Sequence, residues 1–221
     1  MKHVRMVPTL LVVGFLTSTT VFGQEAAPAD SPGKFYAKPY GGFIGLQDMN
    51  IRYVADGQSA DLSVNTGFGF TNGISFGYAF TERISAEFGW EYKANTITVN
   101  YNDEKITGDY ASNFAYLSAF YTLSSSGRFR PYVGAGAVVI PEIDMDFRIG
   151  DENSSFSNTG NIGFQGLAGL DFQFARRWAM NWEAKYVAFQ NFDMKNESHS
   201  TSLENLRYRP FIFNIGLKYM F

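Results

Sequence analysis

The segment from Phe211 to Phe221, FIFNIGLKYMF, alternates between large apolar residues and a mostly small or polar set. The large apolar residues are Phe211, Phe213, Ile215, Leu217, Tyr219 and Phe221. A period of two residues indicates a β-strand with two different faces. Terminal segments of soluble domains usually fray. An aromatic strand at this position therefore predicts the closing strand of a barrel, which is paired on both sides and presents one face to lipid.

The same pattern recurs along the chain, interrupted by turn residues. It predicts strands over 35–47, 67–80, 83–93, 109–123, 129–140, 160–174, 178–189 and 211–221. Short connections near 81, 125 and 176 alternate with long polar ones over 48–65, 95–107, 141–159 and 191–205. Such alternation is typical of an all-β, eight-stranded antiparallel up-and-down transmembrane β-barrel with short periplasmic turns and long extracellular loops.

Alternation alone does not say which face points inward, because soluble lipocalin-like barrels have an apolar interior. Size decides between the two orientations. The lumen of an eight-stranded barrel is just wide enough for side chains to fill, and one face of these strands carries 11 Phe, 4 Tyr and 3 Trp, too many rings to share that lumen. The other face is rich in Gly and Ala. The aromatic face is therefore expected to point outward, toward lipid. The patterns over 35–47 and 109–123 leave the facing of those two strands open.

The first 33 residues are expected to lie outside the barrel domain, which is predicted to span 34–221. Residues 1–23 have the features of a secretory signal peptide: a basic start at Lys2 and Arg5, a short apolar run and a small-residue cleavage site. Residues 24–33 form a polar spacer. The chain has no cysteine and a formal net charge of −3, which excludes thiolate chemistry and offers no basic patch for nucleic acid.

Three segments resemble a known family. RPYVGAGA (130–137), GISFGYAF (73–80) and FNIGLKYMF (213–221) are similar to the OmpA/OmpX-type, opacity-protein-like outer membrane barrels. The resemblance implies a monomer in the outer membrane of a Gram-negative bacterium, in contact with lipid and lipopolysaccharide. It also implies recognition by the barrel-assembly machinery through a terminal signal, formed by Phe213, Ile215, Leu217, Tyr219 and Phe221. We expect no peptidoglycan-binding domain after the barrel, so the resemblance does not imply cell-wall tethering.

Charged residues on the predicted inner face form the main candidate site. They are Arg83, Glu87, Glu91, Lys93, Arg130, Asp171, Glu183, Lys185 and Lys218. Unpaired charges in a narrow lumen are costly, so pairing is expected. Two interpretations follow: a network of ion pairs that plugs the lumen, which the narrow lumen favours, or a polar path for small solutes.

Neither metal binding nor catalysis has strong support in the sequence. Acidic residues in 141–159 are suitable calcium ligands, but their spacing does not match the twelve-residue calcium loop; they are Glu142, Asp144, Asp146, Asp151 and Glu152. His199 lies beside Ser198, Ser200 and Thr201 in a long connection, where serine and threonine are common. We therefore expect no catalytic residues, no metal and no cofactor.

These features predict a non-enzymatic outer-membrane barrel for envelope structure and surface presentation, similar to an adhesin or surface antigen. The first alternative is a porin-like small-solute channel, which requires a mobile lumen plug. The second is a soluble lipocalin-like ligand-binding barrel, which the size argument disfavours.

Overall fold

The computed structural model describes residues 35–55, 58–101, 104–149, 152–196 and 201–221. Within these residues the chain forms twelve β-strands in one antiparallel sheet. The strands are β1 (Phe35–Gly45), β2 (Met49–Ala55), β3 (Gln58–Ala79), β4 (Ile84–Tyr101), β5 (Glu104–Thr122), β6 (Phe129–Ile149), β7 (Glu152–Asn158), β8 (Asn161–Ala175), β9 (Trp178–Phe189), β10 (Phe192–Asn196), β11 (Thr201–Leu206) and β12 (Phe211–Met220). The described part of the chain contains no helix long and apolar enough to cross a membrane.

Eight of these strands close into a ring. β1 pairs with both β12 and β3, and the remaining contacts run β12–β9–β8–β6–β5–β4–β3. We call this the barrel ring. The prediction that the terminal strand closes the barrel is confirmed, because β12 pairs with the first strand: Tyr36 lies opposite Met220, and the amide of Phe221 donates to the carbonyl of Phe35 over 3.0 Å. The expectation of eight strands in all is not confirmed, because the described residues form twelve.

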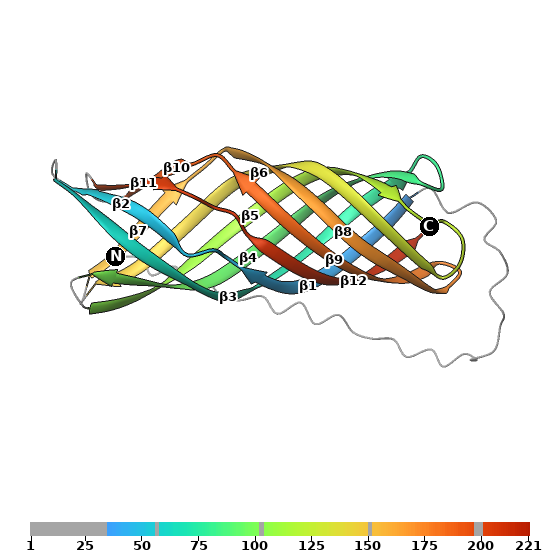
Figure 1. Cartoon of the computed structure of the whole chain (residues 1–221), viewed down its shortest axis with the longest axis horizontal. Coiled ribbons are helices and arrows are strands. Elements are labelled where there is room, and N and C mark those ends of the chain that lie inside the picture. Colours follow the sequence, from blue (N-terminus) through green and yellow to red (C-terminus); the bar gives the residue numbers. More distant parts are fainter. Residues whose placement is uncertain (1–34, 56–57, 102–103, 150–151, 197–200) are drawn as a thin grey trace, which may run out of the picture.

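The additional strands come from segments that the sequence predicted to be loops. β2, β11, β10 and β7 pair in that order and connect β3 to β6, while β3, β4, β5 and β6 extend beyond the barrel ring. Together these eight strands close a second ring, which we call the collar. Figure 1 shows the collar strands β2, β10 and β11 at one end of the elongated molecule and the C-terminus at the other.

Two β-bulges mark the passage from barrel ring to collar. The register between β3 and β4 shifts between Thr66 and Gly69, and that between β5 and β6 shifts beside Pro141. Proline has no amide hydrogen and is tolerated in sheets at bulges, so Pro141 is compatible with a strand that continues through it. Each bulge adds one residue to its strand, so the alternation of inward and outward side chains shifts by one position beyond the bulge. In β6 the inward residues change from Val138 and Ile140 to Ile143 and Met145.

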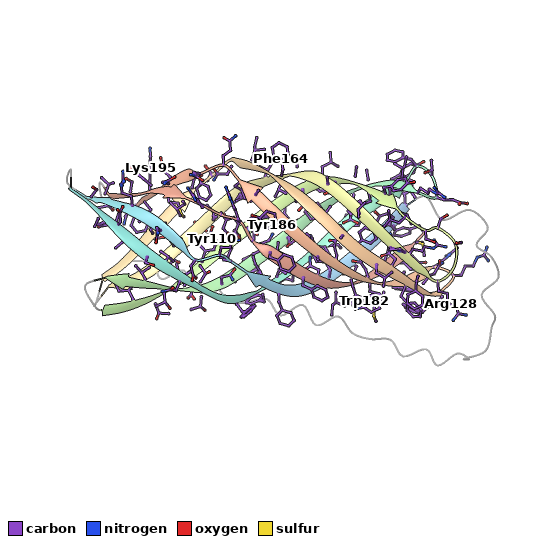
Figure 2. All side chains as sticks on the ribbon, viewed as in Figure 1. Tyr110, Arg128, Phe164, Trp182, Tyr186 and Lys195 are labelled. Carbon is purple, nitrogen blue, oxygen red and sulfur yellow. The ribbon has the colours of Figure 1, made fainter. Side chains whose placement is uncertain are left out.

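The outside of the barrel ring is apolar. Its exposed large side chains include Phe70, Phe76, Phe88, Trp90, Leu117, Phe164, Trp178, Tyr186, Phe211, Phe213 and Ile215. Phe164 and Tyr186 are labelled in Figure 2, and Phe164 projects away from the barrel wall. An apolar outer face around a closed ring of strands is favourable in lipid.

The facing of the collar is the reverse. Its outer side carries exposed polar residues, among them Asn50, Arg52, Asp61, Ser63, Thr96, Thr107, Glu142, Asp146, Asp193 and Lys195. Its interior is lined by buried apolar residues: Ile51, Val64, Ile97, Val99, Ile106, Ile143, Met145, Phe156, Phe192, Met194, Leu203 and Leu206. The collar therefore has the facing of a water-soluble barrel, whereas the barrel ring has that of a membrane barrel.

The two strands whose facing the sequence left open are now placed. In β1 the inward side chains are Tyr36, Lys38, Tyr40 and Ile44. In β5 they are Tyr110, Ser112, Phe114, Tyr116, Ser118 and Phe120. Aromatic residues thus occupy both faces of the sheet, and the hydroxyl groups of the inward Tyr40 and Tyr116 reach carboxylates of the lumen.

Candidate functional site: the lumen and the interior of the collar

The lumen of the barrel ring holds a compact network of ion pairs. Glu91 contacts Lys185 at 2.6 Å and Lys93 at 3.0 Å. Glu183 contacts Lys38 at 3.4 Å and Lys185 at 3.5 Å. These five side chains come from β1, β4 and β9, and each is 3% exposed or less. Such burial requires the charges to be neutralised by one another.

Two further contacts extend the network toward the short turns. Glu87 lies 3.1 Å from Lys38, and Lys218 lies 2.8 Å from Asp171. The structure thus brings together seven of the nine residues that the sequence predicted: Glu87, Glu91, Lys93, Asp171, Glu183, Lys185 and Lys218. The network has four basic and four acidic members once Lys38 is included.

Arg83 and Arg130 do not belong to this network, which corrects the prediction. Arg83 is exposed and donates to the hydroxyl of Tyr121 over 3.3 Å. Arg130 donates to the carbonyl of Gly127 over 3.4 Å. Both lie at the short-turn rim, where the strands reach the end of the wall and a long side chain extends into solvent instead of the lumen.

Lys38 is the network member that the sequence did not reveal. Both faces of β1 carry aromatic residues, with Phe35 and Phe43 outward and Tyr36 and Tyr40 inward, so alternation of polarity could not assign its facing. The spacing of Tyr36, Lys38 and Tyr40, each two residues from the next, was the one available sign that Lys38 shares a face with two tyrosines. Its ammonium joins Glu87 to Glu183 across the lumen.

Tyrosine hydroxyls complete the hydrogen bonding of the carboxylates. Tyr40 donates to Glu91 over 3.1 Å, Tyr116 to Glu87 over 3.1 Å and Tyr132 to Glu183 over 2.7 Å. A cavity of about 20 Å³ remains beside Lys38, Glu87 and Lys218, which is room for roughly one water molecule. At this level the ion pairs and the tyrosines fill the lumen, apart from that cavity.

Above the network, toward the collar, the interior becomes aromatic and then aliphatic. The ring of Phe114 packs edge-on against Phe189 and Tyr208, with centroids 5.4 and 5.8 Å apart, and Tyr110 lies 5.2 Å from Tyr208. Figure 2 labels Tyr110 in the half of the molecule nearer the collar, where it lies opposite Met145 of β6. The apolar interior of the collar follows directly, so the lumen is divided into a charged part and an apolar part.

Lys93 lies at the boundary between these two parts. It is the residue of the network nearest the collar along β4, and its ammonium is 3.2 Å from the centroid of the Phe114 ring. Its side chain is 1% exposed. Although Glu91 is 3.0 Å away, no acceptor among the described residues is aligned for a hydrogen bond with Lys93 Nζ.

The residues considered for metal binding and catalysis are placed only in part. Glu142, Asp144 and Asp146 lie on β6, not in a loop as the sequence suggested. Asp151 and His199, with Ser198 and Ser200, lie outside the described residues. Among the residues that the structure does describe, no group of three or more His, Cys, Asp or Glu side chains is arranged to hold a metal ion.

A family model described as "Outer membrane protein beta-barrel domain" matches residues 14–221. The chain belongs to this family. It is 25% identical to Outer membrane protein W of Escherichia coli over 218 residues, which cover 96% of this chain and 99% of the relative. Outer membrane protein W of Vibrio cholerae is also 25% identical, covering 91% and 99% of the two chains. The protein is thus an outer-membrane barrel of a Gram-negative bacterium.

Solved structures agree on the fold. The outer membrane protein OprG from Pseudomonas aeruginosa has a TM-score of 0.60 at 16% identity, covering 87% of this chain and 99% of that one. AlkL, solved in lipid bilayers, has a TM-score of 0.55 at 18% identity, covering 91% and 97%. The Escherichia coli outer membrane protease OmpT is similar too, with a TM-score of 0.51 at 10% identity and coverages of 86% and 97%. Structural similarity at this low sequence identity supports the fold and says nothing about function.

Proposed function

We propose that this protein is a non-enzymatic outer-membrane barrel whose collar collects small apolar molecules at the cell surface. The observation that carries the proposal is the reversal of facing between the two rings. A closed ring of strands with a polar outside and an apolar inside is the arrangement that soluble barrels use to hold apolar ligands. Here that arrangement sits on top of a membrane barrel, at the end where long connections face the outside of the cell.

The charged network argues against a water-filled channel. Its ion pairs are buried, its carboxylates accept hydrogen bonds from tyrosines, and a cavity of about 20 Å³ beside it holds roughly one water molecule. An apolar molecule in the collar would have to cross this layer to reach the periplasm, which is unfavourable. The proposed task is therefore capture and transfer to the surrounding lipid, and we expect no stable single-channel steps in a planar bilayer.

Binding of the fluorescent apolar probe 1-aminoanthracene to the full chain in lipid nanodiscs tests the proposal. We expect saturable binding above that of empty nanodiscs. Ile97→Asn, which places an amide inside the collar, should weaken it about tenfold or more, because the amide loses its hydrogen bonds to water there. Thr96→Asn changes the neighbouring outward residue and is the matched control. Equal affinities of the two variants, or no saturable binding, would contradict the proposal.

Envelope structure and surface presentation is the second candidate function. The observation in its favour is that β2, β7, β10 and β11 are hydrogen-bonded into a ring, so the polar outer side of the collar is presented on a fixed framework. This role requires no ligand inside the collar. Wild-type levels of probe binding by a variant with an altered interior would favour it over capture.

A further inference from the structure

We propose that Lys93, at the floor of the collar, binds the head group of an amphipathic monocarboxylate whose hydrocarbon tail occupies the apolar interior above it. The inference rests on the proposed function and names its ligand class. It assigns an anionic, long-chain carboxylate where the collar alone would favour any small apolar molecule.

The bonding of the Lys93 ammonium is incomplete. An ammonium group has three donors, and a buried one needs acceptors to offset its lost hydration. Lys93 Nζ has Glu91 Oε1 at 3.0 Å and the face of the Phe114 ring at 3.2 Å, and none of the described residues offers it an aligned hydrogen bond. A cation–π contact is weaker than a charge-assisted hydrogen bond. A ligand carboxylate would satisfy donors that the protein leaves free.

The charges follow an order along the lumen. The charge nearest the collar along β4 is the Lys93 ammonium, and its ion-pair partner Glu91 also pairs with Lys185. Lys185 in turn lies 3.5 Å from Glu183, which also pairs with Lys38. The network as a whole is neutral, but its member nearest the collar is a lysine that shares its carboxylate with a second lysine. An anion that enters from the collar therefore meets attraction before repulsion.

Polar groups flank Lys93 on the neighbouring strands. Thr71 on β3 and Ser112 on β5 are its register partners, and inward side chains at such positions are about 5 Å apart. The Thr71 hydroxyl donates to Glu91 over 2.9 Å, and the Ser112 hydroxyl lies 3.4 Å from that of Tyr208. The Thr71 hydrogen is thus committed to Glu91, whereas the Ser112 and Tyr208 pair uses one of its two hydroxyl hydrogens and leaves the other for an oxyanion beside the ammonium.

The wall above Lys93 suits a hydrocarbon tail. Phe114 covers the ammonium and packs against Phe189 and Tyr208, and the inward residues Ile97 and Val99 follow on β4. These side chains are 4% exposed or less and pack into one apolar cluster, so an entering tail replaces apolar contacts among them with apolar contacts of its own. From Lys93 to its last residue β4 continues for eight residues, about 26 Å along the strand. Phe114 covers the ammonium in this structure, so an entering carboxylate replaces its ring. A single lysine without a planar arginine fork matches a monocarboxylate better than a phosphate, which arginine pairs bind in a bidentate manner.

The experiment compares displacement of 1-aminoanthracene by dodecanoate and by uncharged 1-dodecanol, using the full chain in lipid nanodiscs with empty nanodiscs subtracted. We expect dodecanoate to displace the probe from the wild type at about tenfold lower concentration than 1-dodecanol. Lys93→Met should abolish this preference and leave displacement by 1-dodecanol unchanged, whereas Lys93→Arg should keep it. Lys195→Met removes the same charge from the outside of the collar and should behave as the wild type.

The outcomes separate the two proposals. If 1-dodecanol displaces the probe but dodecanoate has no advantage, or if Lys93→Met keeps the advantage, the carboxylate site is wrong while capture of apolar molecules stands. If no probe binds at all, both are wrong. Lys93→Met is informative only if it shows the heat-modifiable gel migration of a folded barrel. If it does not, the same displacement measurement is made with Phe114→Leu. Removal of the ring from the ammonium should increase the preference for dodecanoate, and an unchanged preference would overturn the inference.

Discussion

At the scale of single residues, Glu91 has the most partners in the lumen. It accepts hydrogen bonds from Lys185, Thr71 and Tyr40 and forms an ion pair with Lys93. A carboxylate that lies between two ammonium groups lowers their mutual repulsion and offsets the loss of hydration of both. The stability of the network therefore depends more on Glu91 than on any lysine.

Glu91→Gln should be strongly destabilising. The substitution keeps the shape of the side chain but leaves Lys93 and Lys185 buried without their shared counter-charge, so the free energy of unfolding should fall by about 3–5 kcal/mol. The free energy of unfolding is measured by urea titration in lipid vesicles, with the folded and unfolded fractions read from their two bands on a gel. Asp61→Asn removes a carboxylate from the exposed pair with Arg52 and should cost at most about 1 kcal/mol. Similar losses in the two variants would show that the network is not held by charge.

Most of the charged lumen could be predicted from the sequence, because Glu87, Glu91 and Lys93 alternate with Phe88, Trp90 and Tyr92 along one strand. The exceptions have physical reasons. Lys38 lies on a strand that is aromatic on both faces, so polarity does not reveal its facing. Arg83 and Arg130 keep the right alternation but sit at the rim, where solvent competes with the lumen.

At the scale of the strand, glycines and tyrosines pair across the inner wall. Each of four inward tyrosines lies opposite a glycine on the neighbouring strand: Tyr36 and Gly77, Tyr40 and Gly73, Tyr116 and Gly89, Tyr132 and Gly169. A Cβ atom on any of these glycines would overlap the tyrosine ring beside it. The glycines therefore let the rings lie against the wall, from which three of the hydroxyls reach the carboxylates.

Gly89→Ala should test this packing. The new methyl group meets the ring of Tyr116 and moves its hydroxyl away from Glu87, so the free energy of unfolding should fall by about 1–3 kcal/mol. Gly166→Ala is the matched control, because its Cβ has open space around it and should be neutral within about 0.5 kcal/mol. Urea titration of both variants in the same vesicles measures the difference. A loss for Gly166→Ala as large as that for Gly89→Ala would argue against the pairing.

The strand scale is also where the sequence prediction failed, in the four connections taken as loops. Above the membrane a strand needs no aromatic residues on its outer face, so Ile97 and Val99 alternate with threonines and the segment resembles a polar loop. The bulge at Pro141 shifts the alternation by one residue, which hides the continuity of β6. The collar interior could have been suspected from the apolar residues at every second position, but its closure depends on pairings between distant hairpins, which a single sequence does not reveal.

At the scale of the whole molecule, the structure is two stacked barrels with opposite facing. The lower one is apolar outside and charged inside, and the upper one is polar outside and apolar inside. The same four strands, β3 to β6, run through both rings. The environment of a residue is therefore set by its height along a strand as well as by its direction, and both proposals above depend on this arrangement.

Strand β4 allows this arrangement to be measured directly. The chain has no cysteine, so nitroxide labels can be placed singly on cysteines introduced at Phe88, Trp90, Thr96, Ile97 and Val99, with collisions recorded against oxygen and against a water-soluble nickel chelate. We expect high oxygen access at Phe88 and Trp90, high nickel access at Thr96, and protection from the chelate at Ile97 and Val99. Lipid-like access at Thr96, or free nickel access at Ile97 and Val99, would contradict this arrangement.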